Sequence, residues 1–174
     1  GQVGGAISLQ AKTGYDCELI VENCNFTDNS AAQGGAAISS LQNNGNSKVT
    51  VKGSIFTGNN AGLIGGAIYL NALSDAVIED STFTNNIASY YNDTIYNLGT
   101  LKLQGNTIDN IIYNRGNVSV VNATFLFEAE NNTIPAELYQ TVVPYGKLTD
   151  DMGNIIYDPN FNITVDDVEY ETSY

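Results

Sequence analysis

The sequence predicts an all-β fold, a right-handed parallel β-helix in which each repeat forms one coil. The first observation is a Gly-Gly-Ala-Ile element that occurs three times, at Gly4–Ile7, Gly34–Ile38 and Gly65–Ile68. The second is a Phe-Thr-x-Asn element, whose phenylalanines Phe26, Phe56 and Phe83 are 30 and 27 residues apart. Repeats at a nearly constant interval of this length indicate a solenoid, because a single repeat cannot bury its apolar face alone.

The residues before each phenylalanine form the strands of the predicted coil. Apolar side chains lie seven and five positions before it, at Leu19 and Val21, at Val49 and Val51, and at Ala76 and Ile78. This alternation predicts a strand with one face inward. The phenylalanine and the small residue two positions before it have the opposite parity. The change of parity predicts a bend at Asn23, Gly53 and Asp80.

Stacking the coils in register aligns equivalent residues in columns about 4.8 Å apart, which is the spacing between neighbouring strands. One column holds the three phenylalanines. Another holds Asn29, Asn59 and Asn86 at a corner, where stacked amides can bond to one another. The glycine pairs, which include Gly35 and Gly66, are expected to let the backbone turn a second corner.

After the third repeat the period shortens. Ile95-Tyr96-Asn97 returns seventeen residues later as Ile112-Tyr113-Asn114, and Ile108 matches Phe125. These matches predict two lean coils and a β-helix of about five coils over residues 1–127. Residues 128–145 are expected to form a cap or linker, and residues 146–174 a small β segment with Phe161–Tyr170 as one alternating strand.

Charge composition limits the classes of binding partner, and the cysteine spacing argues against a disulfide. The chain carries 19 acidic and 6 basic side chains, a net charge of −13, which argues against nucleic acid and anionic membranes as partners. No apolar run reaches the length of a membrane-spanning helix, so no membrane insertion of this segment is expected. Cys17 and Cys24 lie seven residues apart on a predicted strand, about 20 Å when extended, and are expected to be free thiols.

Six Asn-x-Ser/Thr sequons and a composition rich in Asn, Thr and Gly predict an extracellular glycoprotein. The sequons begin at Asn25, Asn92, Asn117, Asn122, Asn131 and Asn162. The chain also opens within a repeat and without a methionine, so we expect it to be a processed piece of a longer polypeptide.

The repeated elements resemble two families of surface proteins. The pairing of Gly4–Ile7 with Phe26–Asn29, and of their later copies, is similar to the polymorphic outer membrane proteins of chlamydiae. The richer pattern Phe-Thr-x-Asn-x-Ala resembles the adhesin-like surface proteins of methanogenic archaea. This resemblance implies an archaeal cell-surface location and an adhesive role. It also implies that an immunoglobulin-like domain follows the β-helix, with residues 146–174 as its opening strands.

The main alternative is a carbohydrate-active β-helix enzyme, a polysaccharide lyase or a glycoside hydrolase. An inverting hydrolase needs two carboxylates about 6.5–9.5 Å apart over one groove. The candidate acids are Asp75, Glu79, Asp80, Asp93 and Asp109, and Arg115 is the one arginine.

Two further features are expected to be structural rather than catalytic or metal-binding. Cys24 aligns with Ser54 and Ser81 and has no histidine to activate it, so a small core residue is expected there instead of a nucleophile. Asp150, Asp151 and Asn154 could bind calcium weakly, but their spacing favours a solvated turn. No metal or cofactor is predicted.

The best candidate binding site is a group of tyrosines, Tyr90, Tyr91, Tyr96 and Tyr113. Tyr96 and Tyr113 should stack on one face and form an aromatic patch for a sugar, unless they pack under the last coils. The predicted function is a non-catalytic extracellular module that attaches to other cell-surface proteins or glycans. Self-association into a filament is also expected, by addition of the strand at Phe161–Tyr170 to another subunit, unless the tail is the start of a further domain.

Overall fold

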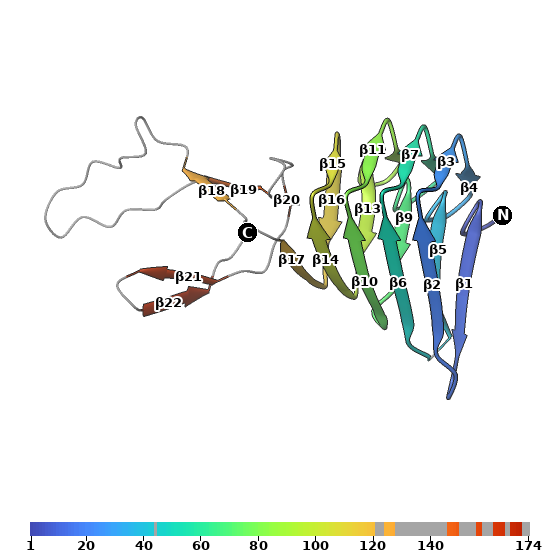
Figure 1. The fold of residues 1–174 in the computed structure, drawn as a ribbon, viewed down its shortest axis with the longest axis horizontal. Coiled ribbons are helices and arrows are strands. Elements are labelled where there is room, and N and C mark those ends of the chain that lie inside the picture. The colour runs from blue at the N-terminus through green and yellow to red at the C-terminus, as the bar shows by residue number, and fades with distance from the viewer. Residues whose placement is uncertain are drawn as a thin grey trace, which may run out of the picture.

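The computed structural model describes residues 1–43 and 45–120, with side chains over 1–41 and 45–119, and several strands beyond residue 120. The protein is all-β and forms a parallel β-helix of about four turns, which confirms the predicted fold class. The coils stack side by side along the long axis, with the N-terminus at one end (Figure 1). Within the described residues there is no helix, and therefore none that could span a membrane.

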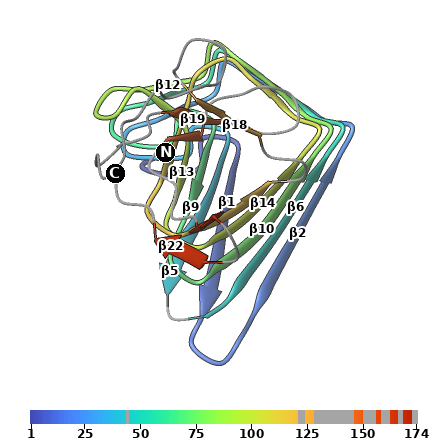
Figure 2. The ribbon, with the colours of Figure 1, turned by 90° about the vertical axis from the view of Figure 1, so that its left-hand side faces the viewer.

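The strands of successive coils form four parallel sheets. Sheet 1 contains β1 (Ile7–Lys12), β5 (Ile38–Asn43), β9 (Ile68–Leu70), β13 (Asp93–Asn97), β16 (Ile111–Asn114) and β20 (Ile156–Tyr157). Sheet 2 contains β2 (Cys17–Glu22), β6 (Ser47–Lys52), β10 (Ser74–Glu79), β14 (Thr100–Gln104) and β17 (Asn117–Val120). Sheet 3 contains β3 (Asn25–Thr27), β7 (Ile55–Thr57), β11 (Thr82–Thr84) and β15 (Thr107–Ile108). Sheet 4 contains β4 (Ser30–Ala31), β8 (Asn60–Ala61) and β12 (Ile87–Ala88), and the coils superpose when viewed along the axis (Figure 2).

The core is a set of columns that run along the axis, as the repeat predicts. Phe26, Phe56 and Phe83 are register partners on β3, β7 and β11. Their ring centroids are 4.7 and 4.5 Å apart, and the rings are within 6° of parallel. The predicted phenylalanine column is therefore confirmed, and Ile108 on β15 extends it by one coil.

The corners carry the backbone conformations that the sequence requires. Asn23, Gly53 and Asp80 all have positive φ, between 48° and 55°, which confirms the predicted bend between sheets 2 and 3. At the corner before sheet 1, Gly35 has a φ of 58°. A Cβ on Gly66 would lie 2.4 Å from the backbone nitrogen of Ile87, so the coil approaches too closely there for any side chain.

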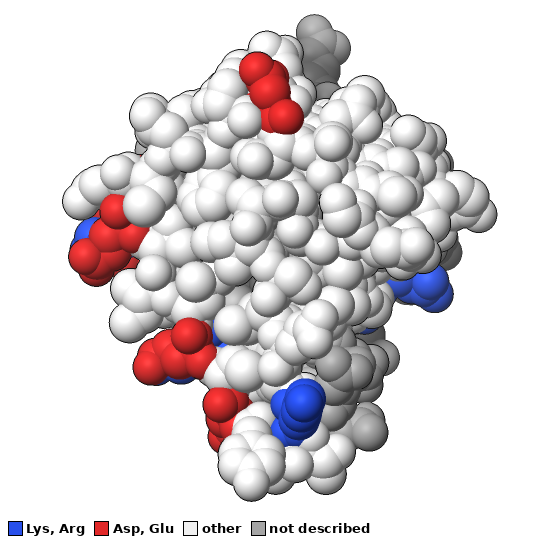
Figure 3. Space-filling view, turned by 90° about the vertical axis from the view of Figure 1, so that its right-hand side faces the viewer, with Lys and Arg blue, Asp and Glu red and all other residues white. Residues whose placement is uncertain are grey.

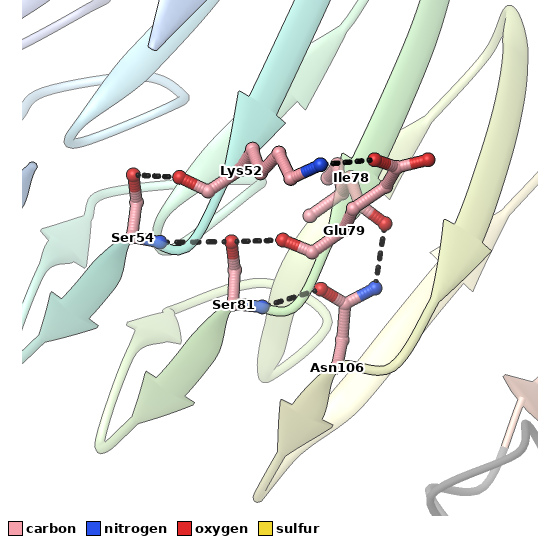
Figure 4. A network of polar contacts seen from close by, with 6 residues as sticks. All are labelled: Lys52, Ser54, Ile78, Glu79, Ser81 and Asn106. Atoms are coloured by element: carbon pink, nitrogen blue, oxygen red, sulfur yellow. Dashed lines mark hydrogen bonds and ion pairs between the residues drawn. The ribbon is translucent and has the colours of Figure 1, made fainter. Parts of the chain in front are cut away.

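A hydrogen-bonded ladder of small side chains joins the coils at the bend between sheets 2 and 3 (Figure 4). The N–H of Ser54 donates to Ser81 Oγ at 3.1 Å, and the N–H of Ser81 donates to Asn106 Oδ1 at 2.9 Å. Each hydroxyl donates in turn to the carbonyl two residues earlier, at Lys52 and Glu79. The serine two positions before each of these phenylalanines therefore bonds to the turn of its own coil and to the neighbouring coil.

The prediction that Cys24 is a core residue is wrong. The Cys24 N–H does donate to Ser54 Oγ at 3.1 Å, so its alignment with Ser54 and Ser81 holds. However, β3 is the edge strand of sheet 3, and the Cys24 side chain is exposed. Figure 3 shows the end of the β-helix at which the N-terminus lies. Charged side chains lie at the rim of this face, and its middle carries none. Cys17 and Cys24 are both free, as predicted.

The lean coils have the predicted register. Tyr96 pairs with Tyr113 on sheet 1, and Leu101 pairs with Val118 on sheet 2. The match of Phe125 to Ile108 is wrong, because β18 (Thr124–Phe127) pairs antiparallel with β19 (Gly146–Thr149). The N–H and C=O groups of these two strands therefore bond to each other.

The later strands also differ from the single strand predicted at Phe161–Tyr170. The segment contains two antiparallel strands, β21 (Asn162–Val165) and β22 (Val168–Glu171), separated by two aspartates, which favour turns. Strand β20 was not predicted; it continues sheet 1 because Ile155-Ile156-Tyr157 repeats Ile111-Ile112-Tyr113. Residues 128–145, predicted as a cap or linker, lie outside the described residues.

Candidate functional site

The outer face of sheet 1 carries a column of tyrosines. Tyr69, Tyr96 and Tyr113 are successive register partners on β9, β13 and β16. The isoleucine before each of them is fully buried, and side chains alternate along a strand, so the tyrosines point away from the core. The rings of Tyr96 and Tyr113 are 5.1 Å apart and 13° from parallel, which confirms the predicted stacking. Tyr69 was missed, although Ile68-Tyr69 matches Ile95-Tyr96 in the sequence.

Two more tyrosines reach this column from the turn before β13. The Tyr91 ring stacks on Tyr113 with centroids 4.1 Å apart, and the Tyr90 ring meets Tyr91 edge-on at 4.5 Å. We call Tyr69, Tyr90, Tyr91, Tyr96 and Tyr113 the tyrosine cluster. Tyr96 is only 6% exposed and therefore packs within the cluster, whereas Tyr90 is 70% exposed. The accessible rings are thus Tyr90 and the half-buried Tyr69, Tyr91 and Tyr113.

The hydroxyl groups of the cluster bond to one another and to Arg115. Tyr91 donates a hydrogen bond to Tyr113, and this bond is the main cause of the raised pKa of Tyr91. Arg115 donates to Tyr96, which raises the pKa of the guanidinium. Burial raises the pKa of Tyr96, against the lowering effect of Arg115. The raised pKa values of Tyr69, Tyr91 and Tyr96 keep these three hydroxyls protonated at neutral pH, so each of them can donate and accept hydrogen bonds.

A buried carboxyl group lies directly behind the exposed turn. Asp93 is fully buried, and its Oδ2 accepts a 2.7 Å hydrogen bond from the N–H of Gly65, while Oδ1 has no hydrogen-bond partner. In the two earlier coils the equivalent N–H groups, of Gly4 and Gly35, donate to backbone carbonyls. A carboxylate oxygen thus replaces a carbonyl here. Burial raises the pKa of Asp93 from 3.8 to about 6, although the N–H groups of Gly65 and of Asp93 itself lower it.

Replacement of Asp93 by asparagine should change how stability depends on pH. Because the pKa of Asp93 is raised in the folded state, ionisation of this carboxyl group lowers the free energy of unfolding. This penalty is absent below about pH 4 and increases as the pH rises towards and through about 6. Above pH 7 the penalty should reach about 2–3 kcal/mol. Asparagine keeps an acceptor for Gly65 and removes the charge. Urea unfolding at pH 4.5 and 7.5 should show that Asp93→Asn gains clearly more stability relative to wild type at the higher pH than at the lower one.

The exposed residue Asp75 provides the control, because Asp75→Asn removes one negative charge from the surface of β10. The interpretation of Asp93 is wrong if both variants shift the two free energies of unfolding equally, or if Asp93→Asn loses stability at pH 7.5.

The structure does not bring the other predicted acids together. Glu79 pairs with Lys52 at 3.6 Å on sheet 2, and Asp109 Oδ2 accepts a 2.7 Å hydrogen bond from the N–H of Asn85. Asp80 forms the positive-φ corner of its coil. Among the described residues no group of three His, Cys, Asp or Glu side chains is placed to hold a metal ion. Asp150, Asp151 and Asn154 lie outside the described residues.

The sequon asparagines of the described coils lie at the surface, as predicted. Asn25, Asn92 and Asn117 are exposed, and Asn92 is in the same turn as Tyr90 and Tyr91. The side chains of the remaining sequons are outside the described residues; these are Asn122, Asn131 and Asn162.

No protein-family model, curated protein or solved structure matches this chain. The function of the tyrosine cluster must therefore be argued from its own residues.

Proposed function

We propose that this chain is a non-catalytic module of an extracellular surface protein of archaeal type, and that the tyrosine cluster attaches it to glycans on other surfaces. The observation that carries the proposal is the 70% exposure of Tyr90 beside the hydroxyls of Tyr91 and Tyr113. An exposed aromatic ring stacks on the apolar face of a sugar, and neighbouring hydroxyls bond to the sugar's own hydroxyls. The exposed sequons at Asn25, Asn92 and Asn117 support an extracellular location.

The support beneath the cluster suits a binding role. Tyr69, Tyr96 and Tyr113 are held on neighbouring strands of a parallel sheet. Tyr91 is stacked on Tyr113 and meets Tyr90 edge-on. Binding groups that are already ordered lose little conformational entropy when a ligand binds. We also propose self-association through the tail: β21 and β22 pair with each other, and no third strand among the described residues pairs with either, so an outer edge could accept a strand of another subunit.

One observation favours the enzyme alternative. A carboxyl group with a pKa of about 6, as Asp93 has, is suited to general acid catalysis. Against this role, the Asp93 side chain is fully buried and its Oδ2 is bonded to the backbone of Gly65. A substrate could not reach this buried carboxyl group without local opening of the structure. We therefore assign Asp93 a structural role.

Removal of the exposed ring should weaken attachment and leave the fold intact. A labelled chain, produced in a host that adds no N-glycans, is applied to an array of glycans. Tyr90→Ala should bind the retained glycans about 10-fold more weakly than wild type, as expected for the loss of one stacked ring. Tyr15→Ala is the matched control, because Tyr15 is 75% exposed in the loop between β1 and β2.

Three results would contradict the proposal. They are the absence of any bound glycan, an equal loss in the Tyr15 variant, and the release of reducing or unsaturated ends from a polysaccharide. The last result would establish the enzyme alternative.

A further inference from the structure

The one arginine of the chain, Arg115, contacts the tyrosine cluster. Arg115 follows β16, and its backbone N–H donates to the carbonyl of Asn97 at 2.8 Å, which fixes the base of the side chain. Its guanidinium donates to the hydroxyl of Tyr96 and lies within electrostatic range of Tyr113 and Tyr91. The aromatic residues and this hydrogen bond hold the cation at the edge of the exposed patch.

The charge of Arg115 is not neutralised by the described part of the protein. The ion pairs found there join lysines to acids, Lys48 to Glu18 at 3.2 Å and Lys52 to Glu79 at 3.6 Å. The side chain of Arg115 is exposed. A guanidinium has five N–H donors, so the bond to Tyr96 leaves several of them facing solvent.

We propose that the glycan bound at the tyrosine cluster is acidic, and that Arg115 binds the carboxylate of its sugar. This inference rests on the proposed function and deepens it. The planar guanidinium matches a carboxylate through two parallel hydrogen bonds. Tyr91, which is within electrostatic range of Arg115, contacts the exposed ring of Tyr90, and that ring offers a face for the sugar. A sulfate on the sugar presents the same kind of anion to the guanidinium.

The attraction for an anion comes from this one cation and not from the net charge of the chain. The whole chain has a net charge of −13, but residues 1–119 contain five basic and nine acidic side chains, a net charge of −4. Of the acids in that part, Asp93 acts electrostatically on Tyr96, and it is buried. The remaining acids of the chain are concentrated after residue 127. An acidic chain repels polyanions in general, so preference for an acidic glycan requires a specific cation.

The test compares two glycans with the same sugar backbone, one with charged carboxylates and one with uncharged methyl esters. Oligogalacturonate and its full methyl ester are titrated into the chain, produced without N-glycans so that Asn92 is unmodified. Wild type should bind the acid about 10-fold more tightly than the ester, since hydrogen bonds to charged groups are the stronger ones. Arg115→Gln should remove this preference, and Arg115→Lys should keep part of it. Lys102→Gln is the control, because exposed Lys102 lies on sheet 2 and the change removes the same charge.

The outcomes separate this inference from the proposed function. Equal binding of acid and ester by wild type overturns the role of Arg115 and leaves the glycan site standing, as does an equal effect of Lys102→Gln. Binding of neither glycan overturns the role of Arg115, and the array then decides whether the glycan site also fails. Sulfated and unsulfated dextran form a second pair, in which an Arg115-dependent preference for the sulfated form would assign sulfate as the anion.

Discussion

Replacement of Phe56 by alanine is expected to lower the free energy of unfolding by about 3–5 kcal/mol. Phe56 is fully buried, and its ring is stacked on both faces, against Phe26 at 4.7 Å and Phe83 at 4.5 Å. Alanine would leave a cavity between two rings that are held on neighbouring strands. Those strands pair in register above and below the gap, so the backbone cannot close it. Urea unfolding followed by far-ultraviolet circular dichroism measures the loss.

Phe26 provides the matched control within the same column. Its ring contacts Phe56 on one side, and the residue is 8% exposed because β3 is an edge strand. Phe26→Ala should therefore cost clearly less than Phe56→Ala. An equal or greater cost for Phe26→Ala would show that the stack is not what stabilises the column.

Replacement of Asn59 by alanine is the second change with a large expected effect. Its Oδ1 accepts from both the N–H and the side-chain amide of Asn29, at 3.1 and 2.8 Å. Its Nδ2 donates to the carbonyl of Phe26 at 3.0 Å and to Asn86 Oδ1 at 2.7 Å. Alanine removes four hydrogen bonds at a buried corner, where each group left unpaired costs about 1–3 kcal/mol. We expect a total loss of about 3–5 kcal/mol in the free energy of unfolding, since water can reach part of the corner.

Asn29 occupies the end of the same ladder and is half-buried. Asn29→Ala removes the side-chain bond to Asn59 and leaves the backbone bond in place. We expect it to cost about 1 kcal/mol, as for a typical single hydrogen bond. If Asn59→Ala costs no more than Asn29→Ala, the amide ladder does not stabilise the corner.

These two columns were predictable from the sequence because they consist of identical residues at equal intervals. Phenylalanine stacks on phenylalanine and asparagine bonds to asparagine, so the residues themselves define the register. The same reasoning located the bends, since Asn23, Gly53 and Asp80 interrupt the alternation of the strands and tolerate positive φ. It also placed Tyr96 against Tyr113 over the shortened period.

Features that depend on what covers a residue were not predictable in this way. Cys24 has the alignment of a core position and is nevertheless exposed, because it lies at the end of the stack. Asp93 lies two residues before Ile95, where the earlier coils have glycine or alanine. Nothing in its local sequence indicates that its carboxyl group is buried against Gly65. The parallel pairing of β20 was missed because thirty-odd residues separate it from the last strand of the regular repeats.

The sequence by itself therefore determined the class of fold, the register of its coils and the residues of its columns. Local repetition is sufficient for this, because each coil can pair its strands and bury its apolar face only against an equivalent neighbouring coil. The tertiary structure decided which tyrosines are accessible, that Tyr91 folds back onto Tyr113, and that Arg115 reaches the hydroxyl of Tyr96. Exposure and side-chain contact depend on the path of turns and on the order of coils in space, which a one-dimensional pattern of residue types does not contain.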